Sequence, residues 1–168
     1  MNIDKDLVAA MATPLVLAIL ALTCLVLAAC STGPARRVSE PAASIQQLTV
    51  QADGNWSVAL RIDNFSSIPM RFDSLRLDLE VEDHVAGALV AAPALTIGPE
   101  SADVVTVTLA PAAAAKFAVA QALAGGKSIE YSLQGTLTAT PDEERQRQFE
   151  MERDSVLSPA PGLPGVMR

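Results

Sequence analysis

The chain has 168 residues, a formal net charge of −7 and only 4% aromatic residues. This length allows one ordinary domain. The acidic balance argues against nucleic acid as a partner, because neutralising phosphates requires clustered Lys and Arg. The chain has a single His, and its two Cys both lie near the N-terminus, which excludes metal clusters, Cys/His catalysis and a disulfide framework for the rest of the chain, so no metal or other cofactor is expected.

The N-terminal segment is predicted to be a secretory signal. No charged side chain lies between Asp6 and Arg36, and Leu15–Val26 is an almost continuous apolar run. An apolar run that ends in small residues is typical of a signal peptide. The ending Leu27-Ala28-Ala29-Cys30 resembles the bacterial lipoprotein lipobox. The resemblance implies cleavage before Cys30 and lipidation of its thiol.

Two other interpretations of this segment stay open. Leu7–Ala29 is about long enough to span a bilayer, so an uncleaved anchor is one alternative. The head of the chain, with Asp4 and Asp6 around Lys5, also lacks the positive charge with which a signal normally begins. Cys24 is the other candidate for lipidation, but it lacks a Leu three positions earlier. Both a lipid and a retained helix predict a domain that is tethered to a membrane and lies outside the cytoplasm.

The expected organisation has four parts. Residues 1–29 form the signal peptide, and residues 30–43 form the lipidated Cys and a flexible linker rich in Ser, Thr, Gly, Pro and Arg. In this linker Arg36 and Arg37 are expected to be solvated. Ser31 after Cys30 fits the pattern that sorts lipoproteins to the outer membrane.

The third part, residues 44–157, is predicted to be a single antiparallel β-sandwich. Apolar and polar residues alternate clearly in 56–62 and 75–81, and with less regularity in five further segments: 45–50, 85–90, 105–109, 129–137 and 147–156. Turn signals separate them, among them Asp53-Gly54-Asn55 and five prolines between the runs. About seven short strands with regular turns indicate an all-β sandwich of the immunoglobulin or fibronectin type III kind.

Three local features complete this prediction. The Ala-rich segment Pro111–Ala124 has Pro at its start and Gly125-Gly126 at its end, which predicts one short helix across an end of the sandwich. Gly135 interrupts the strand at 129–137 and predicts a bulge or a close approach of two backbones. Residues 158–168, the fourth part, contain three Pro and two Gly and are predicted to be a disordered tail.

The ordered series of motifs resembles the type-2 late embryogenesis abundant (LEA-2) proteins, which contain the water-stress and hypersensitive-response (WHy) domain. The family hallmark is a strand ending in Asn, followed after a few residues by Pro and a second strand of alternating apolar residues. Asn64 and Pro69 match this Asn and Pro, with Asn64-Phe65-Ser66 in place of the usual Asn-Pro-Asn. Ile97-Gly98-Pro99 and Ile129–Gly135 are further matches, and the similarity covers about residues 45–159.

The resemblance implies a non-catalytic stabilising or binding module associated with desiccation and envelope stress. We therefore expect a lipid-anchored lipoprotein that faces the periplasm and protects client proteins or envelope components. An adaptor or ligand-binding subunit of an envelope complex is the alternative. Asn64 and Pro69 are expected to be structural, because Asn caps turns with its side chain and Pro fixes φ before the next strand.

Other candidate chemistry is rejected on the residues themselves. Gly125-Gly126-Lys127-Ser128 resembles the end of a phosphate-binding loop, but Gln121 stands where that motif needs Gly and the segment follows a helix instead of preceding one. His84 has no second His or Cys in the domain with which to bind a metal. The nearby Glu80, Glu82 and Asp83 lack the Gly-punctuated spacing of a calcium loop. No serine has a neighbouring His that would act as its base, so nucleophilic hydrolysis is not expected.

Overall fold

The computed structural model describes residues 36–168, which form nine strands and one helix. The strands are β1 (Ala42–Val50), β2 (Trp56–Asn64), β3 (Met70–Val81), β4 (His84–Ala91), β5 (Leu95–Ile97), β6 (Ser101–Leu109), β7 (Ile129–Pro141), β8 (Arg147–Leu157) and β9 (Val166–Met167), and the helix is α2 (Ala113–Gly125). Within this described part, no helix is long and apolar enough to span a bilayer. The predicted all-β architecture with one short helix is confirmed.

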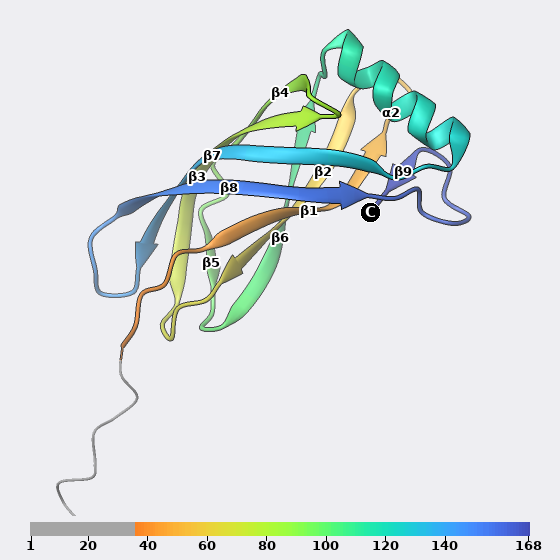
Figure 1. Cartoon of the computed structure of the whole chain (residues 1–168). Coiled ribbons are helices and arrows are strands. Elements are labelled where there is room, and N and C mark those ends of the chain that lie inside the picture. The colour runs from red at the N-terminus through yellow and green to blue at the C-terminus, as the bar shows by residue number, and fades with distance from the viewer. Residues whose placement is uncertain (1–35) are drawn as a thin grey trace, which may run out of the picture. The chain divides into compact units, whose positions relative to one another are not determined.

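The strands form two antiparallel sheets that pack face to face (Figure 1). Sheet A has the order β6-β2-β1-β9. Sheet B has the order β4-β3-β7-β8, with β5 paired to β3 beyond the end of β4. Because successive residues of a strand point to opposite faces, the alternation in the sequence places one set of side chains between the sheets.

The core lies between the two sheets. Each inner face is made of the apolar half of the alternating segments, for example Trp56, Val58, Leu60 and Ile62 of β2, all of them at most 1% exposed. The opposite residues of the same strands lie outside, and most of them are polar or small. Burying a large apolar side chain contributes about 1.5–3 kcal/mol, so these inward positions are the main stabilising element of the fold.

Helix α2 covers one end of the sandwich, as predicted from its Pro and Gly boundaries (Figure 1). It buries Ala115, Val119 and Ala122, which are spaced to lie on one face. Gly126 ends the helix in the left-handed conformation, with φ of 61°. The loops between β2 and β3 and between β5 and β6 lie at the other end, where β1 begins.

Gly135 is a point of close backbone approach, one of the two predicted alternatives. It pairs with Leu77 of β3 and has φ of 155°. A Cβ at this position would lie 2.1 Å from the carbonyl oxygen of Arg76, a distance that no side chain tolerates. Strands β3 and β7 therefore depend on a residue without a side chain at this position.

The predicted disordered tail is corrected by the structure. Residues 158–168 turn back on the sandwich, and Val166 and Met167 pair with Thr49 and Leu48 as β9. Met167 is fully buried, and the backbone N–H of Val50 donates to the carbonyl of Gly165 at 2.8 Å. The apolar pair covers part of the free edge of β1, and the Gly and Pro residues before it shape turns. Composition alone does not reveal this long-range pairing.

The predicted flexible linker is also shorter than expected. Strand β1 begins at Ala42 instead of Ile45, and the segment before it is hydrogen-bonded to the loop between β2 and β3. Arg36 and Arg37, expected to be solvated, contact that loop or the one after β7: the Arg36 guanidinium donates to the carbonyl of Asp142 at 2.6 Å. The short strand β5 was not predicted from the sequence.

Candidate functional site

Of the lipidation and family-motif residues predicted from the sequence, only Asn64 and Pro69 lie in the described part of the chain. Leu27, Ala28, Ala29 and Cys30 lie outside it. Asn64 is the last residue of β2, and Pro69 directly precedes β3. They therefore stand at the two ends of the 65–69 loop, which joins sheet A to sheet B.

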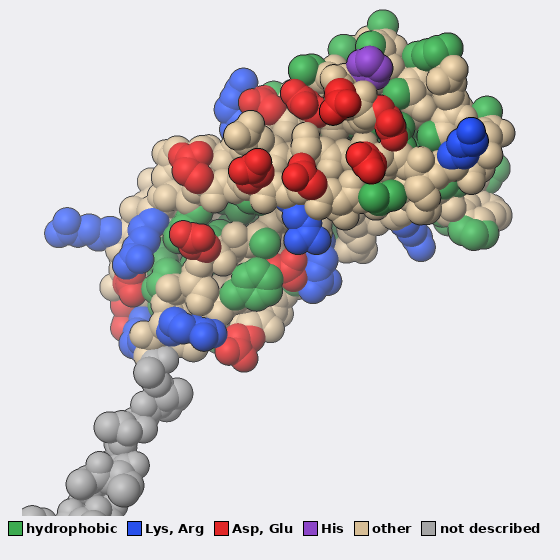
Figure 2. Space-filling model, in the orientation of Figure 1, with side chains coloured by type: hydrophobic (Ala, Val, Ile, Leu, Met, Phe, Trp, Pro, Cys, Tyr) green, Lys and Arg blue, Asp and Glu red, His purple; other side chains and the backbone are tan. Residues whose placement is uncertain are grey.

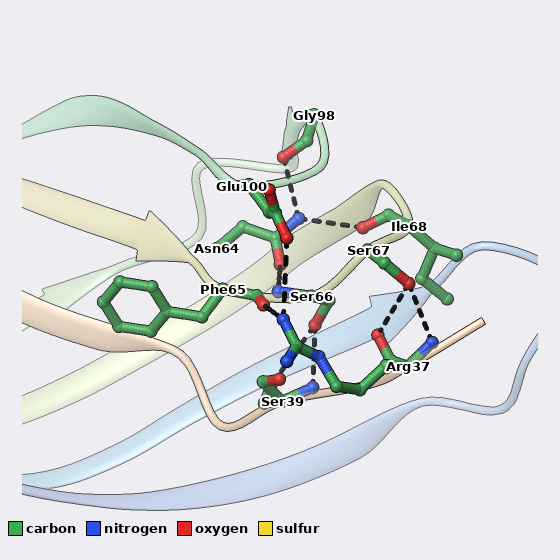
Figure 3. A network of polar contacts seen from close by, with 9 residues as sticks. All are labelled: Arg37, Ser39, Asn64, Phe65, Ser66, Ser67, Ile68, Gly98 and Glu100. Carbon is green, nitrogen blue, oxygen red and sulfur yellow. Dashed lines mark hydrogen bonds and ion pairs between the residues drawn. The ribbon is translucent and has the colours of Figure 1, made fainter. Parts of the chain in front are cut away.

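The Asn64 side chain is buried, with 1% of its surface exposed, and joins both sheets through its amide (Figure 3). Its Nδ2 donates to the carbonyl oxygens of Ile68, Ile97 and Gly98 at 3.0, 3.1 and 2.9 Å. Its Oδ1 accepts a hydrogen bond of 2.9 Å from the backbone N–H of Ser66. The amide thus contacts four backbone groups, and its two N–H hydrogens are shared among the three carbonyls.

Pro69 contributes through its backbone. It has no N–H to donate, and its carbonyl oxygen accepts from the N–H of Asp142 at 2.9 Å. This bond connects the 65–69 loop to the loop that follows β7. The arrangement thus gives both Asn64 and Pro69 contacts that hold the loop in place.

The same loop binds the segment that precedes β1, and we call this set of contacts the N-terminal clasp (Figure 3). The N–H of Arg37 donates to the Ser67 hydroxyl at 2.8 Å, and its carbonyl accepts from the N–H of Ser67 at 3.0 Å. The N–H of Ser39 donates to the Ser66 hydroxyl at 3.0 Å. One backbone–backbone bond and two bonds to serine hydroxyls thus hold residues 37–39 along the loop.

The Arg37 side chain closes the N-terminal clasp. Its guanidinium donates to the carbonyl of Phe65 at 3.1 Å and lies 3.6 Å from the Glu100 carboxylate. Both charged side chains are largely exposed, so the ion pair itself contributes little. Phe65 is held by its backbone, and half of its surface is exposed to solvent.

A second surface of interest is the outer face of sheet B, where carboxylates gather (Figure 2). Strands β3, β7 and β8 pair in a register that brings their outward residues side by side. Six of these outward residues are exposed acids, and Glu82, just past the end of β3, is a seventh: Asp78, Glu80, Glu82, Glu130, Glu150, Glu152 and Asp154. Arg71 and Arg76 of β3 also point outward, but none of the seven acids forms an ion pair with a described residue. We call this set the acidic face.

Asp73 differs from the acidic face because it is held by donors. Its carboxylate accepts from Gln146 at 2.9 Å and from Thr140 at 2.7 Å, and Arg71 lies 2.8 Å away. The hydrogen bonds from Gln146 and Thr140, helped by the charge of Arg71, lower the pKa of Asp73 below its ordinary value of 3.8 against the opposing effect of burial. This network joins the start of β3 to the end of β7 and the loop after it.

The structure places the rejected candidates as solvent-exposed or structural groups. His84 is exposed at the start of β4, and Gly125-Gly126 end a helix. Over residues 36–168 no group of three or more His, Cys, Asp or Glu is arranged to hold a metal ion. Tyr131 is a further structural residue that the sequence did not single out. Its buried hydroxyl accepts from the N–H of Ile45 at 3.1 Å and links β7 to a bulge in β1. A lone Tyr on an inward strand position was the available signal.

Comparisons with known proteins identify one family model and several solved structures that are similar to this chain. A family model described as "Late embryogenesis abundant protein" (LEA_2) matches residues 59–152, more than half of the chain. No curated protein sequence matches significantly. Similar solved structures include a crystal structure of a protein from Archaeoglobus fulgidus, with 13% identity, a TM-score of 0.40 and coverage of 74% of this chain and 98% of that one. A solution structure of a protein from Arabidopsis thaliana has 13% identity, a TM-score of 0.42 and coverage of 76% and 83%.

Proposed function

Because the chain belongs to the LEA_2 family of late embryogenesis abundant proteins, we propose that it is a membrane-tethered lipoprotein that protects the cell envelope, or proteins in it, when water becomes scarce. Proteins of this family are in general non-catalytic. In this proposal Cys30 carries the lipid, and the sandwich is displayed in the periplasm, on the outer membrane. Client proteins or envelope components are the partners, and no cofactor is required.

The acidic face is the observation that supports protection most directly. Its seven carboxylates are exposed and lie side by side on three paired strands. Ionised carboxylates are strongly hydrated and repel one another, so a face of this kind retains water and resists self-association. Held on a rigid sheet, it would keep a hydrated layer between neighbouring macromolecules as bulk water is removed.

The protective role is tested by drying cells that lack the gene and carry it back as variants. The triple variant Glu150→Gln, Glu152→Gln and Asp154→Asn removes three neighbouring charges and keeps the size of each side chain. The matched control, Thr106→Gln and Thr108→Gln, changes exposed positions on the outer face of sheet A. We expect survival of drying to fall with the triple variant and to stay at the wild-type level with the control, at equal protein abundance. Normal survival of the deletion strain would overturn the protective role.

The lipid anchor is tested separately, by the intact mass of the protein extracted from membranes. The expected mass is that of a chain beginning at Cys30 with acyl chains attached, since stable anchoring takes more than one chain. Cys30→Ser should abolish both cleavage and acylation, and Cys24→Ser should leave the mass pattern unchanged except for the substitution. A mass that includes residues 1–29 would support the retained-helix alternative.

The adaptor function is a second candidate, and α2 is the observation that favours it. Apart from Lys116 and Gln121, the helix consists of Ala, Val, Leu, Phe and Gly, and Phe117 is 63% exposed. A helix that is apolar on its outer face is typical of a surface that packs against another protein. A partner that co-purifies in constant ratio with the wild type and is lost with Phe117→Ser would support the adaptor function over protection.

A further inference from the structure

We propose that the Phe65 side chain inserts into the lipid surface next to the anchor, so that the 65–69 loop sets the orientation of the sandwich on the membrane. The occupant of this site is the headgroup region of a bilayer. The inference rests on the proposed lipid at Cys30, and it adds a second contact that the anchor alone does not require.

The side chain of Phe65 is exposed on a loop whose backbone is fixed. Phe65 is 50% exposed, while the neighbouring loop residues Ser66 and Ile68 are 0% and 5% exposed. In Figure 3 its ring points away from the other residues drawn, while the backbone of the loop is held by Asn64 and Arg37. The loop therefore presents one aromatic ring to solvent from a fixed backbone. Amphipathic and aromatic side chains in such positions favour the boundary between lipid and water.

The chain between the proposed anchor at Cys30 and the 65–69 loop is short. The N-terminal clasp binds residues 37–39 along the 65–69 loop, so the distance from Cys30 to the loop is limited by residues 30–36. The seven steps from Cys30 to Arg37 span at most about 25 Å when fully extended. A lipid on Cys30 thus keeps Phe65 close to the membrane at all times. This proximity gives a high effective concentration, so even a weak contact is populated.

The charged side chains around Phe65 balance one another. Arg37 and Arg61 lie beside Phe65 together with Glu100 and Asp63, and these four form two opposite pairs at 3.6 and 2.9 Å. The surroundings of Phe65 are therefore neutral as a group, and an anionic lipid surface does not repel them. The acidic face of sheet B would be repelled by the same surface. Charge and apolar exposure thus favour the same orientation.

A matched pair of tryptophan variants tests the proposal. Phe65→Trp places the probe on the loop, and Phe117→Trp places it on α2, at the opposite end of the sandwich with similar exposure. Trp56 is the single native Trp and is 1% exposed, so it gives the same background in both. The full chain extracted from membranes is reconstituted into phosphatidylcholine vesicles with brominated or unbrominated acyl chains, since bromine quenches only a nearby indole.

We expect emission of the Phe65→Trp variant to fall about twofold in brominated vesicles and to shift to shorter wavelength, as for an interfacial indole. The Phe117→Trp variant should show neither change. Equal quenching of both variants, or quenching of neither, would overturn the proposal.

The intact mass of the same samples separates this inference from the proposed anchor. If acyl chains are present and Phe65→Trp is not quenched, the anchor stands and the loop contact fails. If acyl chains are absent and Phe65→Trp is still quenched, the lipid contact stands and the proposed anchor fails. Phe65→Ser provides a complementary test in unbrominated vesicles. Because its loop no longer inserts into the lipid, trypsin should cleave faster after Arg37, while the amount of protein bound stays the same.

Discussion

The two sheets of the sandwich have similar inner faces and different outer faces. Inside, both present buried aliphatic side chains, joined by Trp56 in sheet A and Phe72 in sheet B. Outside, sheet B carries the acidic face, whereas β1, β2 and β6 of sheet A present Ser, Thr, Ala, Val and Gln around one ion pair, Arg61 with Asp63. Folding requires the inner faces to match, and it leaves the outer faces free. The carboxylates of sheet B are therefore a feature that the fold does not explain.

Two buried polar contacts also join one sheet to the other. At one end the Asn64 amide of sheet A holds the carbonyls of Ile97 and Gly98, next to sheet B. In the core the Tyr131 hydroxyl of sheet B accepts from Ile45 of sheet A. If inner contacts govern stability, variants should lose stability in proportion to how much backbone they disturb, and changes outside should matter least.

The largest effect is expected at Gly135 in the acidic sheet. Gly135→Ala puts a Cβ 2.1 Å from the Arg76 carbonyl oxygen and 3.0 Å from the Cα of Leu77, so β3 and β7 must separate. We expect a loss of about 4 kcal/mol or more in the free energy of unfolding, or no folded protein. Gly98→Ala is the control, because its Cβ would meet nothing within 4 Å. Denaturant titration followed by Trp56 emission measures both, and equal stability of the two variants would contradict the close approach.

The next effect in size is expected at Asn64, which links the sheets and supports the N-terminal clasp. Asn64→Ala leaves the N–H of Ser66 and three carbonyls without their partner, which should cost about 2–4 kcal/mol. Asn55→Ala, in a turn where the side chain contacts only Asp53, should cost below about 1 kcal/mol. Trypsin should also cleave faster after Arg37 in Asn64→Ala than in Asn55→Ala. Unchanged cleavage would show that the clasp does not depend on Asn64.

The sequence was sufficient to predict the two sheets, because their core depends on local alternation. The period of two in β2 and β3 and the Pro and Gly around α2 follow from residues close together in the chain. The pairing of β9 with β1 joins residues about 120 positions apart, as Leu48 with Met167, and no local pattern specifies it. A Pro- and Gly-rich tail is compatible with disorder or with turns, and only the free edge of β1 decides between them.

The candidate site was predictable in part for the same reason. The capping bond from Ser66 to Asn64 spans two residues, and Asn before a loop indicates it. The bonds to Ile97 and Gly98 and the clasp on Arg37 and Ser39 depend on segments that meet only in the folded chain. The acidic face also needs the register of β3, β7 and β8, since its members come from three strands.

A smaller effect is expected at Tyr131, the contact between the sheets within the core. Tyr131→Phe keeps the ring and removes the hydroxyl that accepts from the Ile45 N–H beside the bulge in β1. An unsatisfied buried N–H should cost about 1–3 kcal/mol. Hydrogen exchange of the Ile45 amide should become faster than that of Leu48, which stays paired. Unchanged exchange would indicate that this N–H has another partner.

The smallest effect is expected at Asp73. Its carboxylate accepts two side-chain hydrogen bonds and forms an ion pair, unlike the carboxylates of the acidic face. Its pKa is lowered in the folded protein by Gln146 and Thr140, so its contribution to stability is present above the unfolded value of 3.8 and is lost as the pH falls below it. Asp73→Asn should therefore flatten the decline in stability below pH 3.8, and Gln146→Ala with Thr140→Val should flatten it in the same way. Denaturant midpoints measured from pH 6 down to pH 2 test both variants. If the decline is as steep in both variants as in the wild type, the donors around Asp73 do not favour its charged form. Asp73 would then not differ in this respect from the carboxylates of the acidic face.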